Sequence, residues 1–205
     1  MKAIEAFEFN IERAHNLVDL YDRLIKQGMQ HSELDDLLRS SYVQAVGALD
    51  AFVHDRIGER LVQFVRKSLD STSNVLDPIE KELKNVETRE VLKWLTLSRP
   101  FVQVRKRIEE KLGYQSFQQP GKIEEAFLLI GKREIWKPVA AEMGVNVSDI
   151  KRKLIQVSER RNQIVHEGDR EKSRLKKHQK RPIEEQDVID LLDFIEKVGK
   201  GLVKI

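Results

Sequence analysis

The chain has 205 residues, 40% of them hydrophobic and 35% charged, which indicates a globular protein with charged helix surfaces and suits one domain over residues 1–205. Its net charge of +3 makes no general case for a nucleic-acid partner, so any electrostatic argument must be local. The absence of cysteine excludes disulfides and zinc–thiolate sites, and we expect a reducing, cytoplasmic location.

The first part of the chain predicts two long helices. Apolar residues recur three and four positions apart over residues 7–25, as one face of a helix requires. A second and longer helix is expected over residues 32–64, where Ser32 and Asp35 resemble a capping box at its start. The uncharged stretches are no longer than about 10 residues, and acidic residues interrupt the first fifteen, so we expect neither a membrane-spanning helix nor a secretory signal.

The middle of the chain, residues 71–147, predicts shorter helices. Asp77 and Pro78 favour a helix start, and Pro100 favours another break. The residues expected to reach the core here are aromatic or aliphatic: Trp94, Phe101, Val104, Phe127, Leu128, Ile135 and Trp136. We interpret this stretch as a helical insertion.

The last part predicts two helices joined by a basic loop. A helix is expected from a cap at Ser148 to about His166, with Gly168 just after it. Residues 167–182, EGDREKSRLKKHQKRP, are rich in lysine and arginine and predict a mobile loop. Pro182 is expected to begin the final helix. No segment alternates with period two, so the predicted fold class is all-α: a single bundle of roughly seven to eight helices, framed by two long early helices and a long C-terminal one.

The candidate site is the stretch ERRNQIVHEGD, residues 159–169. Asn162 and His166 are four residues apart and share a helix face, and Arg161 starts on a neighbouring face from which its long side chain reaches back. An imidazole takes and gives a proton near neutral pH, and a guanidinium suits a phosphate or a pentacoordinate phosphorus. Asn162 is expected to orient the imidazole or to hydrogen-bond the substrate.

Two interpretations of this stretch stay open. An arginine five residues before a histidine is expected about 0.4 times by chance in such a chain, and about 0.01 times with asparagine after the arginine. The simpler interpretation is a solvated helix end whose basic groups complement the helix dipole. The basic loop, residues 167–182, also has two interpretations: a solvated connection, or a guide for RNA. The candidate RNA-binding residues are Arg160, Arg170, Lys172, Arg174, Lys176 and Lys177. We interpret Arg160 as a surface residue or as an extra group that positions a phosphate, and not as a catalytic residue.

Other sites find little support. His54 lies four residues after Asp50, a spacing that favours a local structural contact. The paired glutamates at 109–110 and 184–185 have no histidine at a usable spacing, so we expect no metal ion and no cofactor. The phosphate-loop, dinucleotide-binding, zinc-protease and esterase motifs are absent from the sequence.

The motif resembles that of a known family. RNQIVH fits the R-x4-6-H signature of the HEPN superfamily, with a polar residue after the arginine. The stretch SSYVQAVGALDAFVHDRI is similar to a long helix of the RiboL-PSP-HEPN type, which has an acidic residue in a similar setting, here Asp50. The resemblance extends from about residue 32 to the end of the chain, and residues 71–147 would be a family-specific insertion.

The resemblance implies a metal-independent endoribonuclease, in which the RNA 2′-hydroxyl attacks the phosphorus at a composite site between two protomers of a homodimer. It implies Arg161 as the phosphate-binding group, His166 as the acid–base group and Asn162 as a support, and we carry over Asp50 as a further support. It also implies a toxin or an effector of antiviral defence, with an antitoxin or defence-system protein as a partner. Two alternatives remain: a catalytically inactive HEPN-like module that binds RNA or protein, and a helical adaptor that acts in assembly.

Overall fold

The computed structural model describes residues 2–69, 74–171 and 180–205, and these residues form nine α-helices, one 3-10 turn and no β-strand. The prediction of an all-α fold is confirmed, with slightly more helices than expected. Within these ranges, no helix is both long enough and apolar enough to cross a membrane. The elements are α1 Ala3–Lys26, α2 His31–Ser68, η1 Asn74–Leu76, α3 Asp77–Leu83, α4 Thr88–Leu95, α5 Pro100–Leu112, α6 Pro120–Leu128, α7 Trp136–Met143, α8 Val147–Glu167 and α9 Glu185–Val203.

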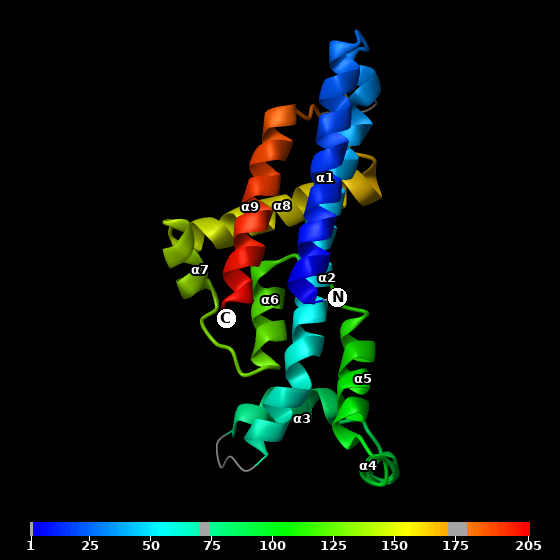
Figure 1. Ribbon diagram of the computed structural model, residues 1–205, viewed down its shortest axis with the longest axis vertical. Helices are drawn as coiled ribbons and strands as arrows, with labels where there is room; N and C mark the ends of the chain where they lie inside the picture. The colour runs from blue at the N-terminus through cyan, green and yellow to red at the C-terminus, as the bar shows by residue number, and fades with distance from the viewer. Residues whose placement is uncertain (1, 70–73, 172–179) are drawn as a thin grey trace.

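Three long helices form the frame, as the sequence predicts. α1 and α2 lie side by side along the long axis of the molecule, and α9 packs against both (Figure 1). α1 buries the residues of its predicted apolar face, from Phe7 to Tyr21. α9 approaches α1 closely at Gly199, where an added Cβ would lie 2.4 Å from the Phe7 ring. Glycine is therefore required for this packing.

α2 is the central helix of the molecule. It has 38 residues and packs against α1, α5, α6, α8 and α9. Its buried side chains, which include Leu49, Phe52 and Ile57, point in several directions because helices surround it. Each helix that packs against α2 is therefore anchored to the core of the protein.

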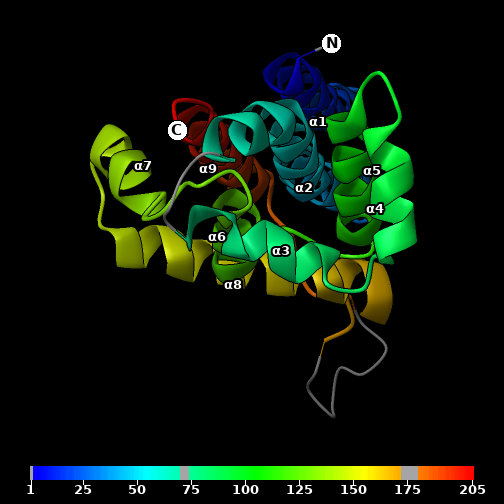
Figure 2. The same cartoon turned by 90° about the horizontal axis from the view of Figure 1, so that it is seen from below.

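α8 covers one side of this frame. It crosses behind α9, α1 and α2 in Figure 1, and in Figure 2 it lies along the lower edge with no further helix of the described chain beyond it. Ile150, Leu154 and Val157 turn inward and are buried, whereas Ile155 and Asn162 on the opposite face are exposed. α8 is thus half embedded and leaves one face open.

The middle helices differ in how deeply they pack. Phe127, Ile135 and Trp136 are buried, as predicted, and Phe101 and Val104 lie at the margin of the core. Trp94 does not belong to the core, because it is only half-buried and α4 has no fully buried residue. The core prediction therefore fails for α4, whose apolar side chains remain at the surface.

Three predicted helix starts are wrong by a few residues. α2 begins at His31 with Gln30 as its cap, so Ser32 lies inside the helix. α8 begins one residue before Ser148, which lies inside the helix rather than at its cap. α9 begins at Glu185 instead of Pro182, because the Arg181–Pro182 segment is held against the end of α8 by two hydrogen bonds described below.

Candidate active site

α8 ends where the sequence predicts, just after His166. Gly168 has a φ of 64°, in the left-handed region that suits glycine, and the next residue, Asp169, has a φ of 54°. The Asp169 amide then donates to the Gln163 carbonyl at 3.0 Å, which closes the helix end. This sharp turn fixes where the motif residues and the following loop lie.

The structure brings Arg161 and Asn162 into contact. The Arg161 Nη1 atom donates to the Asn162 Oδ1 atom at 3.2 Å. Arg161 starts near the inward side of α8 and is half-buried, whereas Asn162 is exposed. The guanidinium therefore reaches round toward the open face of the helix, as the length of its side chain allows.

His166 lies on the same open face. Ile155, Asn162 and His166 are separated by seven and four residues, so they line up along the helix, and all three are exposed. Within the described part of the chain, the His166 imidazole has no hydrogen-bond partner. The motif thus presents a guanidinium, an amide and an imidazole toward one accessible surface.

Arg160 has a different environment from Arg161. Its Nη1 atom lies 2.8 Å from the Asp169 Oδ1 atom, and its Nη2 atom donates to Asp169 Oδ2 at 3.0 Å and to the Pro182 carbonyl at 3.1 Å. Burial lowers the pKa of Arg160, although Asp169 opposes this shift. The interpretation of Arg160 as a surface residue is therefore corrected: its guanidinium is engaged within the fold.

Asp169 is the centre of a buried ionic cluster that the sequence did not reveal. Its side chain is 1% exposed and also accepts a hydrogen bond from Arg39 Nε at 2.8 Å. Arg39, on α2, donates in turn to the Arg181 carbonyl at 2.7 Å. Because buried charges are tolerated only when they are paired and hydrogen-bonded, this cluster joins the end of α8 firmly to α2.

The two ends of the basic loop meet beside this cluster. Arg170 and Lys180 form an isolated antiparallel bridge, and the Arg181 amide donates to the Asp169 carbonyl at 2.7 Å. Lys180 also pairs with both oxygens of Asp36 at 2.7 and 2.8 Å, and this hydrogen bonding lowers the pKa of Asp36. Arg170 is exposed at the base of the loop. Four further candidate RNA contacts lie outside the described residues: Lys172, Arg174, Lys176 and Lys177.

Tyr42 adds a second link between α2 and α8. Its hydroxyl donates to the Val157 carbonyl at 3.4 Å, a long hydrogen bond. Burial raises the pKa of Tyr42 to about 12, so the neutral phenol is strongly favoured in the folded protein.

Asp50 has its contacts elsewhere. Its carboxylate accepts hydrogen bonds from the Phe117 amide at 2.6 Å, from Gln118 Nε2 at 3.3 Å and from Ser116 Oγ at 3.4 Å. The Nε2 atom of His54 lies 3.8 Å from the same carboxylate, in the local contact that the spacing predicts. Asp50 thus holds the segment that precedes α6, and none of its hydrogen bonds reaches Arg161, Asn162 or His166.

Comparison with known proteins agrees with this architecture. The family model of RiboL-PSP-HEPN matches residues 8–205, and this range includes the motif on α8, the helix α2 and the middle region 71–147. No curated protein and no solved structure shows a significant match. The chain belongs to the RiboL-PSP-HEPN family.

Proposed function

We propose that this protein is an endoribonuclease that cleaves RNA without a metal ion, with Arg161 and His166 as its catalytic residues. The observation that carries the proposal is the hydrogen bond from Arg161 to Asn162 on the open face of α8 that also presents His166. A cation with several donors and an acid–base group thus lie together where a polynucleotide has access to them.

The chemistry follows from these groups. His166 accepts the proton of an RNA 2′-hydroxyl, whose oxygen forms a bond to the adjacent phosphorus. The bond from phosphorus to the 5′-oxygen breaks, and that oxygen takes a proton from water or from the second histidine that a dimer would supply. Arg161 donates hydrogen bonds to the phosphate oxygens while their charge increases, and Asn162 keeps the guanidinium on this side of the helix. The products are a 2′,3′-cyclic phosphate and a 5′-hydroxyl.

A homodimer would complete the site. One arginine and one histidine are few groups for both proton transfers, and a two-fold axis beside the open face of α8 would double them. Ile155 is 40% exposed on this face. Val165, three residues after Asn162 and next to the same face, is 44% exposed. Apolar area is therefore available for a contact between the two copies.

The oligomeric state tests this arrangement. Sedimentation of the wild type at micromolar concentration should show a dimer, and Ile155→Asp should shift the protein toward the monomer and reduce cleavage. Leu92→Asp is the matched control, because Leu92 is also exposed but lies on α4. A wild type that is strictly monomeric and still cleaves RNA would contradict the composite site.

The nucleophile is tested with a modified substrate. After the preferred cleavage position of a short RNA has been mapped in EDTA, the same RNA is made with a 2′-deoxynucleotide at that position. Cleavage there should cease, and the products of the unmodified RNA should carry a cyclic phosphate. Cleavage of the deoxy-substituted RNA at the same bond would contradict attack by the 2′-hydroxyl.

A binding-only module is the second candidate, because the basic loop beside the motif supports RNA binding whether or not the site reacts. This candidate predicts RNA binding that persists in both Arg161→Ala and His166→Ala, together with no cleavage by the wild type. If the protein is a toxin or defence effector, its expression should arrest growth, and His166→Ala should remove this effect.

A further inference from the structure

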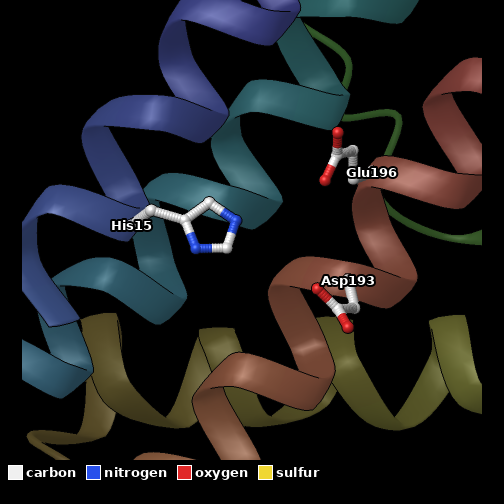
Figure 3. Close-up of side chains that lie close together, drawn as sticks. All are labelled: His15, Asp193 and Glu196. Carbon is white, nitrogen blue, oxygen red and sulfur yellow. The ribbon is translucent and has the colours of Figure 1, made fainter. Parts of the chain in front are cut away.

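A second group of functional side chains lies between α1 and α9, away from the α8 motif. His15 comes from α1, and Asp193 and Glu196 come from α9. Figure 3 shows the imidazole and both carboxylates directed into the space between the two helices. One ligand atom from each residue lies within 4.8 Å of the other two. We propose that these three residues bind a divalent transition-metal ion of the zinc class.

The spacing suits a shared ion better than direct pairing. In the described chain, neither carboxylate approaches a His15 nitrogen within the 4.0 Å of an ion pair. Zinc lies about 2.0–2.2 Å from imidazole nitrogens and carboxylate oxygens, which places ligand atoms around one ion about 3.4 Å apart. A closure of roughly one ångström is therefore needed, and rotation of half-exposed or exposed side chains supplies it.

The ligand types select the class of metal. Imidazole favours zinc and its neighbours in the transition series, whereas calcium and magnesium prefer a shell made entirely of oxygen. Asp193 and Glu196 are three residues apart on one helix and therefore project to the same side. Three protein ligands leave room for water on the ion, as in open zinc sites.

The surrounding charge favours a cation. On α1, Glu12 and Asp19 are three and four residues from His15 and share its face. Lys200 opposes the acids, because its Nζ atom lies 2.5 Å from Glu196 Oε1, and it is the group with which the metal must compete. Within the described chain the other oxygen of Glu196, Oε2, has no hydrogen bond or ion pair.

The proposed metal would join two helices of the frame. α1 and α9 already pack where Phe7 meets Gly199, and the ion would add a cross-link on the solvent side of this contact. Metal binding should therefore stabilise the folded protein, and the stabilisation should grow as the metal concentration rises above the dissociation constant of the site. This role is independent of RNA cleavage at α8.

The test uses the full chain, stripped with EDTA and desalted. Titration with zinc chloride in a calorimeter should show one equivalent bound per chain and a raised melting temperature, whereas magnesium chloride at the same concentration should change neither. His15→Gln and Asp193→Asn should each weaken zinc binding by at least about tenfold. Lys200→Met should strengthen it, because the competing cation is removed.

The control is His166→Ala, which should bind zinc as the wild type does. The melting temperature of each variant without metal shows whether it folds, and if His15→Gln does not fold, the exposed Asp193→Asn decides. Wild-type zinc affinity in the folded His15→Gln or Asp193→Asn variants would overturn the proposal. So would a wild type that binds no zinc, or zinc binding that is lost in His166→Ala.

Discussion

Arg160 and Arg161 are neighbours in the sequence, but they lie in different regions of the molecule. Arg160 points into the buried cluster, where Asp169 and the Pro182 carbonyl occupy its donors. Arg161 reaches toward the open face of α8, where its hydrogen bond within the described chain is to the Asn162 side chain. The structural role and the proposed catalytic role are therefore divided between adjacent residues of the same type.

This difference shows that the function of a basic residue depends on what already satisfies it. A guanidinium with a buried carboxylate partner gains nothing from leaving it for a phosphate, because the carboxylate would then be buried without a partner. A guanidinium held by one neutral amide oxygen keeps most of its donors for a ligand. The predictions that follow test the two regions separately.

The largest expected effect is on stability, at the buried cluster. Asp169→Ala should lower the free energy of unfolding by about 3–5 kcal/mol, because Arg39 and Arg160 then lose their shared counter-charge. Urea unfolding measures this change. Asp36→Ala is the control and should cost less than about 1 kcal/mol, because Asp36 is exposed and water screens its pairs with Lys180 and with Arg39. Equal losses in the two variants would contradict the central role of Asp169.

The second effect separates the two arginines. Arg161→Met should reduce kcat/KM for RNA cleavage by about 10²–10³-fold, as expected when a donor to the transition state is removed. Its free energy of unfolding should change little, because in the described structure Arg161 makes one side-chain hydrogen bond, to the neutral Asn162 amide at 3.2 Å. Arg160→Met should instead lower the free energy of unfolding, because the Arg160 guanidinium is paired with Asp169 in the buried cluster. Loss of cleavage without loss of stability in Arg160→Met would reverse our assignment.

The third effect is at alkaline pH. Because the pKa of Tyr42 is about 12 in the folded protein, against 10.0 for a tyrosine in water, the folded state holds this proton more tightly than the unfolded state. Stability is therefore present below pH 10 and declines as the pH rises from 10 to 12, by up to about 3 kcal/mol. Tyr42→Phe should remove this part of the decline. Parallel stability curves for the wild type and Tyr42→Phe between pH 9 and 11 would contradict it.

The smallest effect concerns the basic loop. Replacing its four central cations with glutamine should make RNA affinity fall less steeply with salt, by about 0.7 in the logarithmic slope for each phosphate that the loop no longer neutralises. These residues are Lys172, Arg174, Lys176 and Lys177. The control replaces four exposed lysines in the α3–α5 region, which should leave the slope unchanged: Lys81, Lys84, Lys93 and Lys106. Equal slopes for the wild type and the loop variant would exclude the loop from RNA binding.

The helices and the motif could be predicted from the sequence because both depend on local spacing. The apolar periodicity places α1, α2, α8 and α9 to within a few residues. The turn after His166 follows from Gly168, whose backbone adopts the left-handed conformation. The alignment of Asn162 with His166 follows from helical geometry alone.

The long-range contacts could not be predicted in this way. The burial of Asp169 depends on Arg39, 130 residues earlier, and nothing near Asp169 in the sequence indicates it. The late start of α9 has the same origin, because Pro182 is held by Arg160 instead of beginning the helix. His15 meets Asp193 only through the packing of the first and last helices.

The most direct test of the proposed function is RNA cleavage in EDTA by wild-type protein and by His166→Ala at equal concentration. We predict that the wild type cleaves, and that His166→Ala is slower by about 10²–10⁴-fold, as loss of an acid–base group implies. The melting temperature of the variant should stay close to that of the wild type, since the His166 side chain is exposed. Equal cleavage by the two proteins, or no cleavage of any RNA by the wild type, would contradict the account.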